Sequence, residues 1–300
     1  MAEVFNSFLS EPQAISVLIE TNLIEHSFYL NKVNHGENLE SDNFKWVISA
    51  SPIFNRILGA SFAPIEENLD DGIQKALNPF KMAQVPVTWL IGPSTKPPDL
   101  GQRLQRHGFV HRGYWKGMAL DLNLLNPYPL HPPGLSVRRV TNLSGLETWL
   151  KIAGAGFQFP ATLTRAYNSY FKNVSFTENS PWQLYIALLN GIPVSTCTLF
   201  LGSEAVGIYW TATVAGANRR GVASFLTWQL LQHAANQGYR MAVLHSTNAG
   251  HPMYQRLGFN DYCNIDIYTY DARPWLVQIK TKVAARLSHM IQANGRQNLL

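Results

Sequence analysis

A short basic turn between an apolar strand and an amphipathic helix constrains the fold of this chain more than any other segment. Residues 205–214 are expected to form the strand, Asn218-Arg219-Arg220-Gly221 the turn, and residues 222–237 the helix. Such a junction presents unpaired backbone N–H groups and the positive end of a helix dipole. The two arginines add positive charge and bidentate donors. The junction is therefore predicted to bind a phosphate or pyrophosphate.

Gly221 and Ala223 leave room for a ligand at the start of this helix. Gly221 has no Cβ, so a pyrophosphate can approach its backbone closely. Ala223 keeps the first helical turn narrow for the same reason, and Ser224 can add a hydroxyl donor. The alternative for Gly221 is an ordinary turn before a helix, and the two adjacent arginines argue against it.

A proline-rich segment, residues 126–134, divides the 300-residue chain into two halves. The second half is expected to contain three neighbouring strands, with Asn190-Gly191 as a hairpin signal between the first two. Its element order predicts a mixed α/β (α+β) domain, mostly antiparallel, that ends in a strand–helix–strand crossover. The expected elements are 135–140, 145–157, 161–174, 182–189, 192–200, 205–214, 222–237, 241–245, a short helix ending near Leu257, and 262–270.

The first half carries a weaker copy of the end of the second half. Residues 86–92 form an apolar segment like 241–245, and residues 100–109 parallel 253–259, each followed by an aromatic-rich stretch. The first half has no counterpart of the basic glycine turn. We therefore predict a duplicated first domain over 1–125, a linker over 126–134, a second domain over 135–272 and a C-terminal amphipathic helix over 273–300.

The composition limits the classes of protein to which this chain can belong. Hydrophobic residues make up 46% and charged residues 14%, which is enough for a packed core. No apolar run approaches the roughly 20 residues of a membrane span, and no signal peptide is evident, so the expected location is cytoplasmic. Cys197 and Cys263 are interpreted as free thiols in a reducing compartment. The net charge of +5 suits an anionic ligand, and the scattered basic residues do not predict nucleic-acid binding.

The tail over 274–300 has apolar residues at helical spacing and a basic surface. It is expected to pack across the two domains or onto a second subunit, which would make a homodimer. A basic helix lying on a membrane is the alternative, although the overall expectation is no membrane contact.

The strand, the basic turn, the helix and Tyr254 shortly before Gly258-Phe259 together resemble the GNAT superfamily of N-acetyltransferases. The pyrophosphate signature of that family is Gln/Arg-x-x-Gly-x-Gly/Ala, and this chain has Asn218-Arg219-Arg220-Gly221-Val222-Ala223. The first position departs from the family pattern, and the neighbouring arginines can compensate. The resemblance covers residues 135–270 well and the first half loosely, so the chain resembles tandem proteins with a degenerate N-terminal GNAT-like domain.

The resemblance implies acetyl-CoA as co-substrate and direct attack by an amine of a small molecule or peptide. The pantetheine arm would run beside the strand end, where a backbone N–H near Val214 would polarise the thioester carbonyl. Asn248 matches a cofactor-contacting asparagine of the family, with capping of the next helix as its alternative. The cofactor-binding residues would be Thr213, Val214, Asn218, Arg219, Arg220, Gly221, Val222, Ala223, Ser224 and Asn248.

Tyr254 matches the position of the general acid of the family. A phenol suits this role, because it keeps its proton at neutral pH until a thiolate leaves. The alternative is a helix tyrosine anchored by its hydroxyl. The first half offers a comparison: Leu104 precedes Phe109 by five residues, as Tyr254 precedes Phe259. Since the first half has neither the acid nor the basic turn, catalysis is expected in the second half alone.

The sequence pattern does not identify the general base. The strand over 206–214 contains no carboxylate, and Glu204 lies just before it. His245, at the end of the next strand, is a candidate because a histidine can take up a proton near neutral pH. Tyr209 is a residue that could face the acceptor, and loss of the proton to water is an equal alternative.

Other functions stay open at this point. The absence of a strand carboxylate and the asparagine at position 218 favour a CoA-binding sensor or scaffold without turnover, whereas Tyr254 favours an enzyme. Nucleic-acid binding through the basic tail would show a steep salt dependence. No metal site is expected, because His245 and His251 have no cysteine or carboxylate at metal-ligand spacing.

Overall fold

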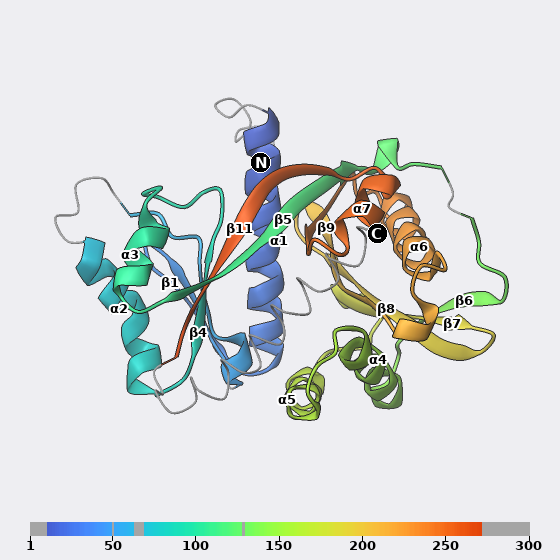
Figure 1. Ribbon diagram of the computed structural model, residues 1–300, viewed down its shortest axis with the longest axis horizontal. Helices are drawn as coiled ribbons and strands as arrows, with labels where there is room; N and C mark the ends of the chain where they lie inside the picture. The colour runs from blue at the N-terminus through green and yellow to red at the C-terminus, as the bar shows by residue number, and fades with distance from the viewer. Residues whose placement is uncertain (1–10, 50, 63–68, 128–129, 272–300) are drawn as a thin grey trace, which may run out of the picture.

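The computed structural model describes residues 11–49, 51–62, 69–127 and 130–271 (Figure 1). The strands of this part form one sheet of eleven strands in the order β1-β2-β3-β4-β11-β5-β10-β9-β8-β7-β6. Two neighbouring pairs, β3 with β4 and β9 with β10, are parallel, and the others are antiparallel. The strands are β1 (Glu37–Glu40), β2 (Lys45–Ile48), β3 (Arg56–Leu58), β4 (Val87–Ile91), β5 (Val110–Asp121), β6 (Leu135–Arg139), β7 (Trp182–Leu189), β8 (Ile192–Leu201), β9 (Ala205–Thr213), β10 (Met241–Ser246) and β11 (Asn260–Tyr270).

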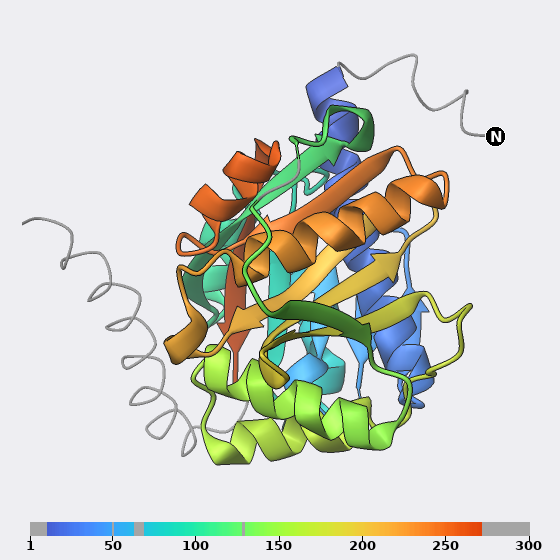
Figure 2. The same ribbon diagram turned by 90° about the vertical axis from the view of Figure 1, so that its right-hand side faces the viewer.

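Helices cover both faces of this sheet. α1 lies across its middle and contacts β5, β9, β10 and β11, while α4 packs on β7 to β9 and α5 packs on α4. α6 covers the other face of the second half and lies in front of the strands as the orange helix of Figure 2. Successive residues of β9 show the two faces, because Ile208 belongs to the α6 core and Tyr209 to the α4–α5 core. The helices are α1 (Glu11–Val33), α2 (Leu69–Met82), α3 (Leu100–Arg106), α4 (Leu143–Gly156), α5 (Ala161–Phe171), α6 (Val222–Asn236) and α7 (His251–Leu257), with short 3₁₀ turns η2 (Pro52–Phe54), η3 (Leu122–Leu124) and η4 (Ala215–Ala217).

The two halves repeat one arrangement, which confirms the predicted α/β fold class with two similar, mostly antiparallel parts. β3, α2 and β4 form a parallel strand–helix–strand crossover, as β9, α6 and β10 do. A short helix and a long strand follow each crossover, α3 with β5 in the first half and α7 with β11 in the second.

The last strand of each half pairs with the other half. β5 pairs with β10 along six residue pairs, from Lys116–Ser246 to Asp121–Met241. β11 in turn pairs with β4, and β5 and β11 pair with each other in the middle of the sheet. Figure 1 shows these two long strands side by side between the halves. The division into domains at residues 126–134 stays a prediction, and the sheet is continuous across both halves.

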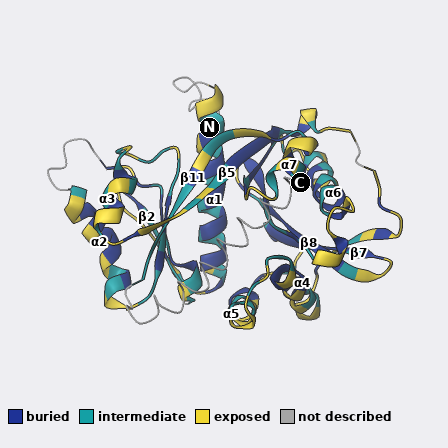
Figure 3. Cartoon of the chain, in the orientation of Figure 1, coloured by how far each residue is buried: buried dark blue, intermediate teal, exposed yellow. Residues whose placement is uncertain are grey.

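The expected elements of the second half are confirmed to within three residues at each end. Asn190 and Gly191 form the predicted hairpin with φ of 52° and 79°, as a two-residue turn of this kind requires. The predicted apolar face of α6 is buried against the sheet, as Figure 3 shows in dark blue; its residues are Val222, Phe225, Leu226, Leu230, Leu231 and Ala234. The helix predicted over 273–300 lies outside the described residues.

Candidate active site

β9 and β10 pair over their first residues and then separate from each other. Their parallel pairing covers four residue pairs and ends at Ile208 and Leu244. β9 then contains one more residue than β8 between Tyr209 and Ala212, and Trp210 in this stretch has a φ of 55°. A bulge of this kind bends its strand. The end of β9 therefore leaves β10, and one backbone edge of β9 becomes available to a ligand.

The basic turn joins the end of β9 to α6. Arg219 and Gly221 adopt left-handed conformations with φ of 62° and 75°, and Arg220 between them does not. Alternation of this kind turns successive N–H groups toward one side. The N–H of Phe225 donates to the Gly221 carbonyl (3.0 Å), so the N–H groups of residues 222–224 have no acceptor within the helix. Both arginines are exposed, and neither forms an ion pair with a described residue. The turn thus has the geometry and charge expected of an anion site.

The linker between the halves lies beside this turn. A Cβ placed on Gly221 would be 3.6 Å from Pro132 Cγ and 4.0 Å from the carbonyl oxygen of Leu130. The His131 ring meets the Phe225 ring edge-on, with 4.5 Å between centroids. Residues 130–132 therefore form one wall of the candidate anion site.

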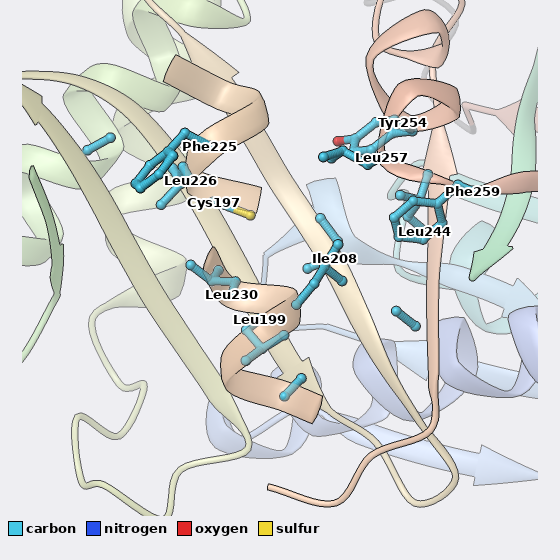
Figure 4. Close-up of a cluster of buried hydrophobic side chains, with 14 of the residues drawn as sticks. Cys197, Leu199, Ile208, Phe225, Leu226, Leu230, Leu244, Tyr254, Leu257 and Phe259 are labelled. Atoms are coloured by element: carbon cyan, nitrogen blue, oxygen red, sulfur yellow. The ribbon is translucent and has the colours of Figure 1, made fainter. Parts of the chain in front are cut away.

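Tyr254 lies where β9 and β10 part (Figure 4). It is buried on α7, and its hydroxyl forms a hydrogen bond with the side chain of Thr211 on β9. Burial raises the pKa of Tyr254 well above its usual value, and the hydrogen bond from Thr211 opposes this only in part. The phenol therefore holds its proton across the neutral range, as a general acid must.

Cys197 lies behind Thr211 on the neighbouring strand. Its Sγ is 3.3 Å from Thr211 Oγ1, and burial raises the pKa of the thiol to about 12. A thiol with this pKa is a poor nucleophile at neutral pH. Cys197 is thus a free, buried thiol as expected, whereas Cys263 is free and half-buried.

His245 is the penultimate residue of β10 and lies on the face of the sheet opposite Tyr254. Both of its ring nitrogens are buried and lack a hydrogen-bond partner among the described residues. Burial, followed by the positive charge of Arg56, lowers the pKa of His245 to about 3. A neutral imidazole with this pKa is a weak general base at neutral pH. The position fits the prediction for a base, whereas the environment disfavours that role.

Tyr209 lies under α1, and Glu204 lies in an exposed turn. The hydroxyl of Tyr209 donates to Asn22 Oδ1 (2.8 Å), and its ring stacks on His26 of α1. α1 therefore covers the ring of Tyr209, which lies on the same face of the sheet as His245, and a place beside the acceptor stays a prediction for Tyr209. Glu204 is exposed in the turn between β8 and β9, as the sequence indicated.

Three further predicted contact residues surround the opening. The N–H of Val214 donates to the Val194 carbonyl (2.9 Å), so this N–H is not available to polarise a thioester. Thr213 Oγ1 forms a hydrogen bond with Ser195 Oγ (2.9 Å). Asn248 is exposed in the loop before α7, and the cap position of that helix is Gly250 with no side-chain cap. Capping of α7 by Asn248 is therefore not observed.

Neither a metal site nor a membrane-spanning helix is found among the described residues. No group of three or more His, Cys, Asp or Glu side chains in this part of the chain could hold a metal ion. Within the same residues, none of the helices has the length and apolar character needed to span a bilayer.

Part of the chain matches a known protein family. Residues 147–259 match the model of the family described as Acetyltransferase (GNAT) family. The chain contains a GNAT domain. The matched span begins in α4 and includes the basic turn, the parted strands and Tyr254. No curated protein matches the sequence of the chain.

Solved structures share the GNAT fold over most of the chain. A GCN5-related N-acetyltransferase from Kribbella flavida is 17% identical, with a TM-score of 0.65 over 86% of this chain and 98% of that one. A GCN5-related N-acetyltransferase from Sphaerobacter thermophilus is 18% identical, with a TM-score of 0.55 over 73% of each chain. A tandem GNAT protein from the clavulanic acid biosynthesis pathway is 17% identical, with a TM-score of 0.52 over 77% of this chain and 79% of that one. The GNAT family match thus lies in the second half, and the fold over most of the chain is shared with GNAT structures, one of them a tandem GNAT protein.

Proposed function

We propose that the chain is an acetyl-CoA-dependent N-acetyltransferase acting on an amine of a small molecule or peptide. One observation carries the proposal: the free N–H groups at the start of α6 and the hydroxyl of Tyr254 flank the same parted strands. A diphosphate on the turn and a thioester beside Tyr254 would be two parts of one extended ligand. Between them, the ligand would follow the free edge of β9.

The reaction would be a direct transfer. The amine nitrogen attacks the thioester carbonyl carbon, a C–N bond forms as the C–S bond breaks, and Tyr254 donates its proton to the departing sulfur. Burial raises the pKa of Tyr254, so the phenol keeps its proton at neutral pH and can donate it to the sulfur as negative charge develops there. The attacking amine gives up its own proton to water or to His245.

The two sides of the sheet would receive different substrates. Tyr254 and the start of α6 belong to one face, and His245 belongs to the other. Acetyl-CoA would bind on the α6 face, and the acceptor would enter from the face that carries α1 and α4. Since α1 belongs to the first half, this arrangement gives the first half a part in acceptor binding.

A CoA-binding sensor without turnover is the second candidate. The low pKa of His245 and the absence of a carboxylate on β9 favour it, because no strong base then lies beside the opening. This candidate keeps the anion site at the turn and gives Tyr254 a structural role.

Release of free CoA thiol separates the two candidates. The protein is mixed with acetyl-CoA and a panel of primary amines, and thiol formation is followed above the background without amine. Acetyl-CoA binding is measured in parallel by calorimetry. Amine-dependent thiol release that Tyr254→Phe reduces supports the transferase. Binding without release on any amine, unchanged in Tyr254→Phe, supports the sensor.

A further inference from the structure

Arg56, at the start of β3, is a half-buried cation. It forms no ion pair with an acidic side chain of the described residues. Its guanidinium lies 5.7 Å from the centre of the Phe54 ring. Arg56, Phe54, His26 and Tyr170 line a small cavity between the first half and α5. An unpaired charge in such a place is costly. A counter-charge supplied by a ligand would offset that cost.

The titratable side chains around Arg56 are uncharged at neutral pH. Burial, followed by the charge of Arg56, lowers the pKa of His26 well below its usual value, and His245 responds in the same way. Burial raises the pKa of Tyr167, and it raises the pKa of Tyr170 to about 12. Arg56 therefore stands as a positive charge in a neutral, aromatic setting.

The carboxylates in the middle of α1 have partners of their own. Glu20 accepts a hydrogen bond from the N–H of Ser94 (2.8 Å). Glu25 accepts one from the N–H of Ser203 (3.1 Å) and another from its hydroxyl. Neither carboxylate forms an ion pair with Arg56, although both come from the helix that packs on this face of the sheet.

The unpaired charge lies on the acceptor side of the opening. Phe54, the neighbour of Arg56, belongs to the same side-chain cluster as Tyr209 and Trp210, which lie where β9 leaves β10. The ring of Tyr167 meets the ring of Trp210 edge-on, with 4.9 Å between centroids. Tyr254 and the basic turn belong to the opposite face, so Arg56 is separate from the acetyl-CoA side.

We propose that Arg56 binds a carboxylate of the acceptor, and that the acceptor is an amino acid or a similar small amine with its own carboxylate. This inference rests on the transferase function proposed above. A guanidinium matches both oxygens of a carboxylate through parallel hydrogen bonds. The rings of Tyr167 and Trp210 would form the apolar wall for the rest of the substrate.

The test compares matched pairs of amines at saturating acetyl-CoA. The pairs are glycine with methylamine, alanine with ethylamine, and phenylalanine with phenethylamine, and O-phosphoethanolamine is added as a phosphate-bearing amine. We expect at least one amino acid to exceed its partner amine about tenfold or more in kcat/KM. Equal values within every pair, or a preference for the phosphate-bearing amine, would overturn the proposal.

Variants separate binding of the carboxylate from a structural role. Arg56→Gln is expected to raise KM for the preferred amino acid about tenfold or more and to leave its partner amine unchanged. Arg56→Lys should restore part of the preference, because it keeps the charge and loses the bidentate geometry. The melting temperature of Arg56→Gln should stay unchanged or rise, since the substitution removes an unpaired buried charge. An equal loss on both members of each pair, with a lower melting temperature, contradicts the proposal.

Arg139 on β6 supplies the matched control. Its guanidinium donates to the carbonyls of Thr177 and Glu178, which is a structural use of a half-buried arginine. Arg139→Gln should lower the melting temperature and keep the preference for the carboxylate.

Failure of the proposed function gives a different result from failure of this inference. If acetyl-CoA binds and no amine of either kind is acetylated, the transferase function is wrong. Calorimetry with the same three amino acids then decides the role of Arg56. Binding to the wild-type protein that is lost in Arg56→Gln supports a carboxylate site, and equal binding or none excludes it.

Discussion

The imidazole of His26 lies flat on the phenol ring of Tyr209, with 3.8 Å between the ring centroids and 7° between the planes. Asn22, on the same helix, accepts the hydrogen bond of the Tyr209 hydroxyl. Tyr209 lies where β9 leaves β10, and α1 comes from the first half. The first half thus supports the opening from behind, although it lacks both a basic turn and a tyrosine in the position of Tyr254.

Arg220→Glu is expected to raise the Kd for acetyl-CoA about tenfold or more, because it replaces an attraction with a repulsion at the turn. Titration calorimetry measures this directly. Lys75→Glu, an exposed position on α2, makes the same charge change elsewhere and should leave the Kd unchanged. An unaltered Kd in Arg220→Glu would remove this residue from the anion site.

Tyr254→Phe is expected to lower kcat by about one hundredfold, within the range for loss of a general acid, and to leave acetyl-CoA affinity unchanged. Pre-saturation of the enzyme with acetyl-CoA isolates the effect on kcat. Tyr239→Phe is the matched control, since its hydroxyl donates to the Gly202 carbonyl (3.1 Å) away from the opening. A normal kcat in Tyr254→Phe would mean that water or another group protonates the sulfur.

The buried histidines make stability fall in acid. The folded-state pKa of His245 is about 3, below the ordinary value of 6.5, so the unfolded chain binds more protons between these two values. The free energy of unfolding therefore falls as pH falls through this window. At about 1.4 kcal/mol per pKa unit, His245 alone would account for a loss of about 3 kcal/mol between pH 6.5 and pH 4. Urea unfolding at a series of pH values measures it.

His245→Gln should flatten this pH dependence, because glutamine does not titrate. His26, whose pKa is also lowered, should leave a remaining slope in that variant. His233→Gln changes an exposed histidine on α6 and should leave the slope as in the wild-type protein. A slope in His245→Gln equal to that of the wild type contradicts the assignment.

Gly156→Ala is expected to destabilise the fold by about 1–3 kcal/mol through overpacking. A Cβ at this position would lie 2.9 Å from Ala212 Cβ and 3.0 Å from the backbone nitrogen of Thr213. The end of α4 would have to move away from β9 beside the opening, so activity should fall as well. Gly216→Ala is the matched control, since a Cβ there meets no atom within 4 Å. Thermal unfolding of both variants tests the difference.

The part of the site that lies close together in sequence could be predicted, and the part built from distant segments could not. The turn at Gly221 and the face of α6 follow from local conformation and spacing, which six to fifteen residues are enough to encode. The low pKa of His245 depends on Arg56, which belongs to the other half of the chain. Likewise, nothing in β9 indicates that α1 from the first half covers Tyr209.

The sequence pattern also did not indicate that β5 and β11 each pair with a strand of the opposite half. β5 and β11 were expected as the final strands of their own halves. The alternation of side chains along each strand is compatible with pairing to either half. Which neighbour a strand takes depends on contacts across the whole sheet, so local residue patterns do not determine it.

The pairing of β5 with β10 and of β11 with β4 makes the two halves depend on each other for a complete sheet. Removing either half would expose unpaired strand edges in the remaining half. Exposed strand edges of this kind promote aggregation. The first half is therefore needed to complete the sheet, even though it has neither the basic turn nor a counterpart of Tyr254.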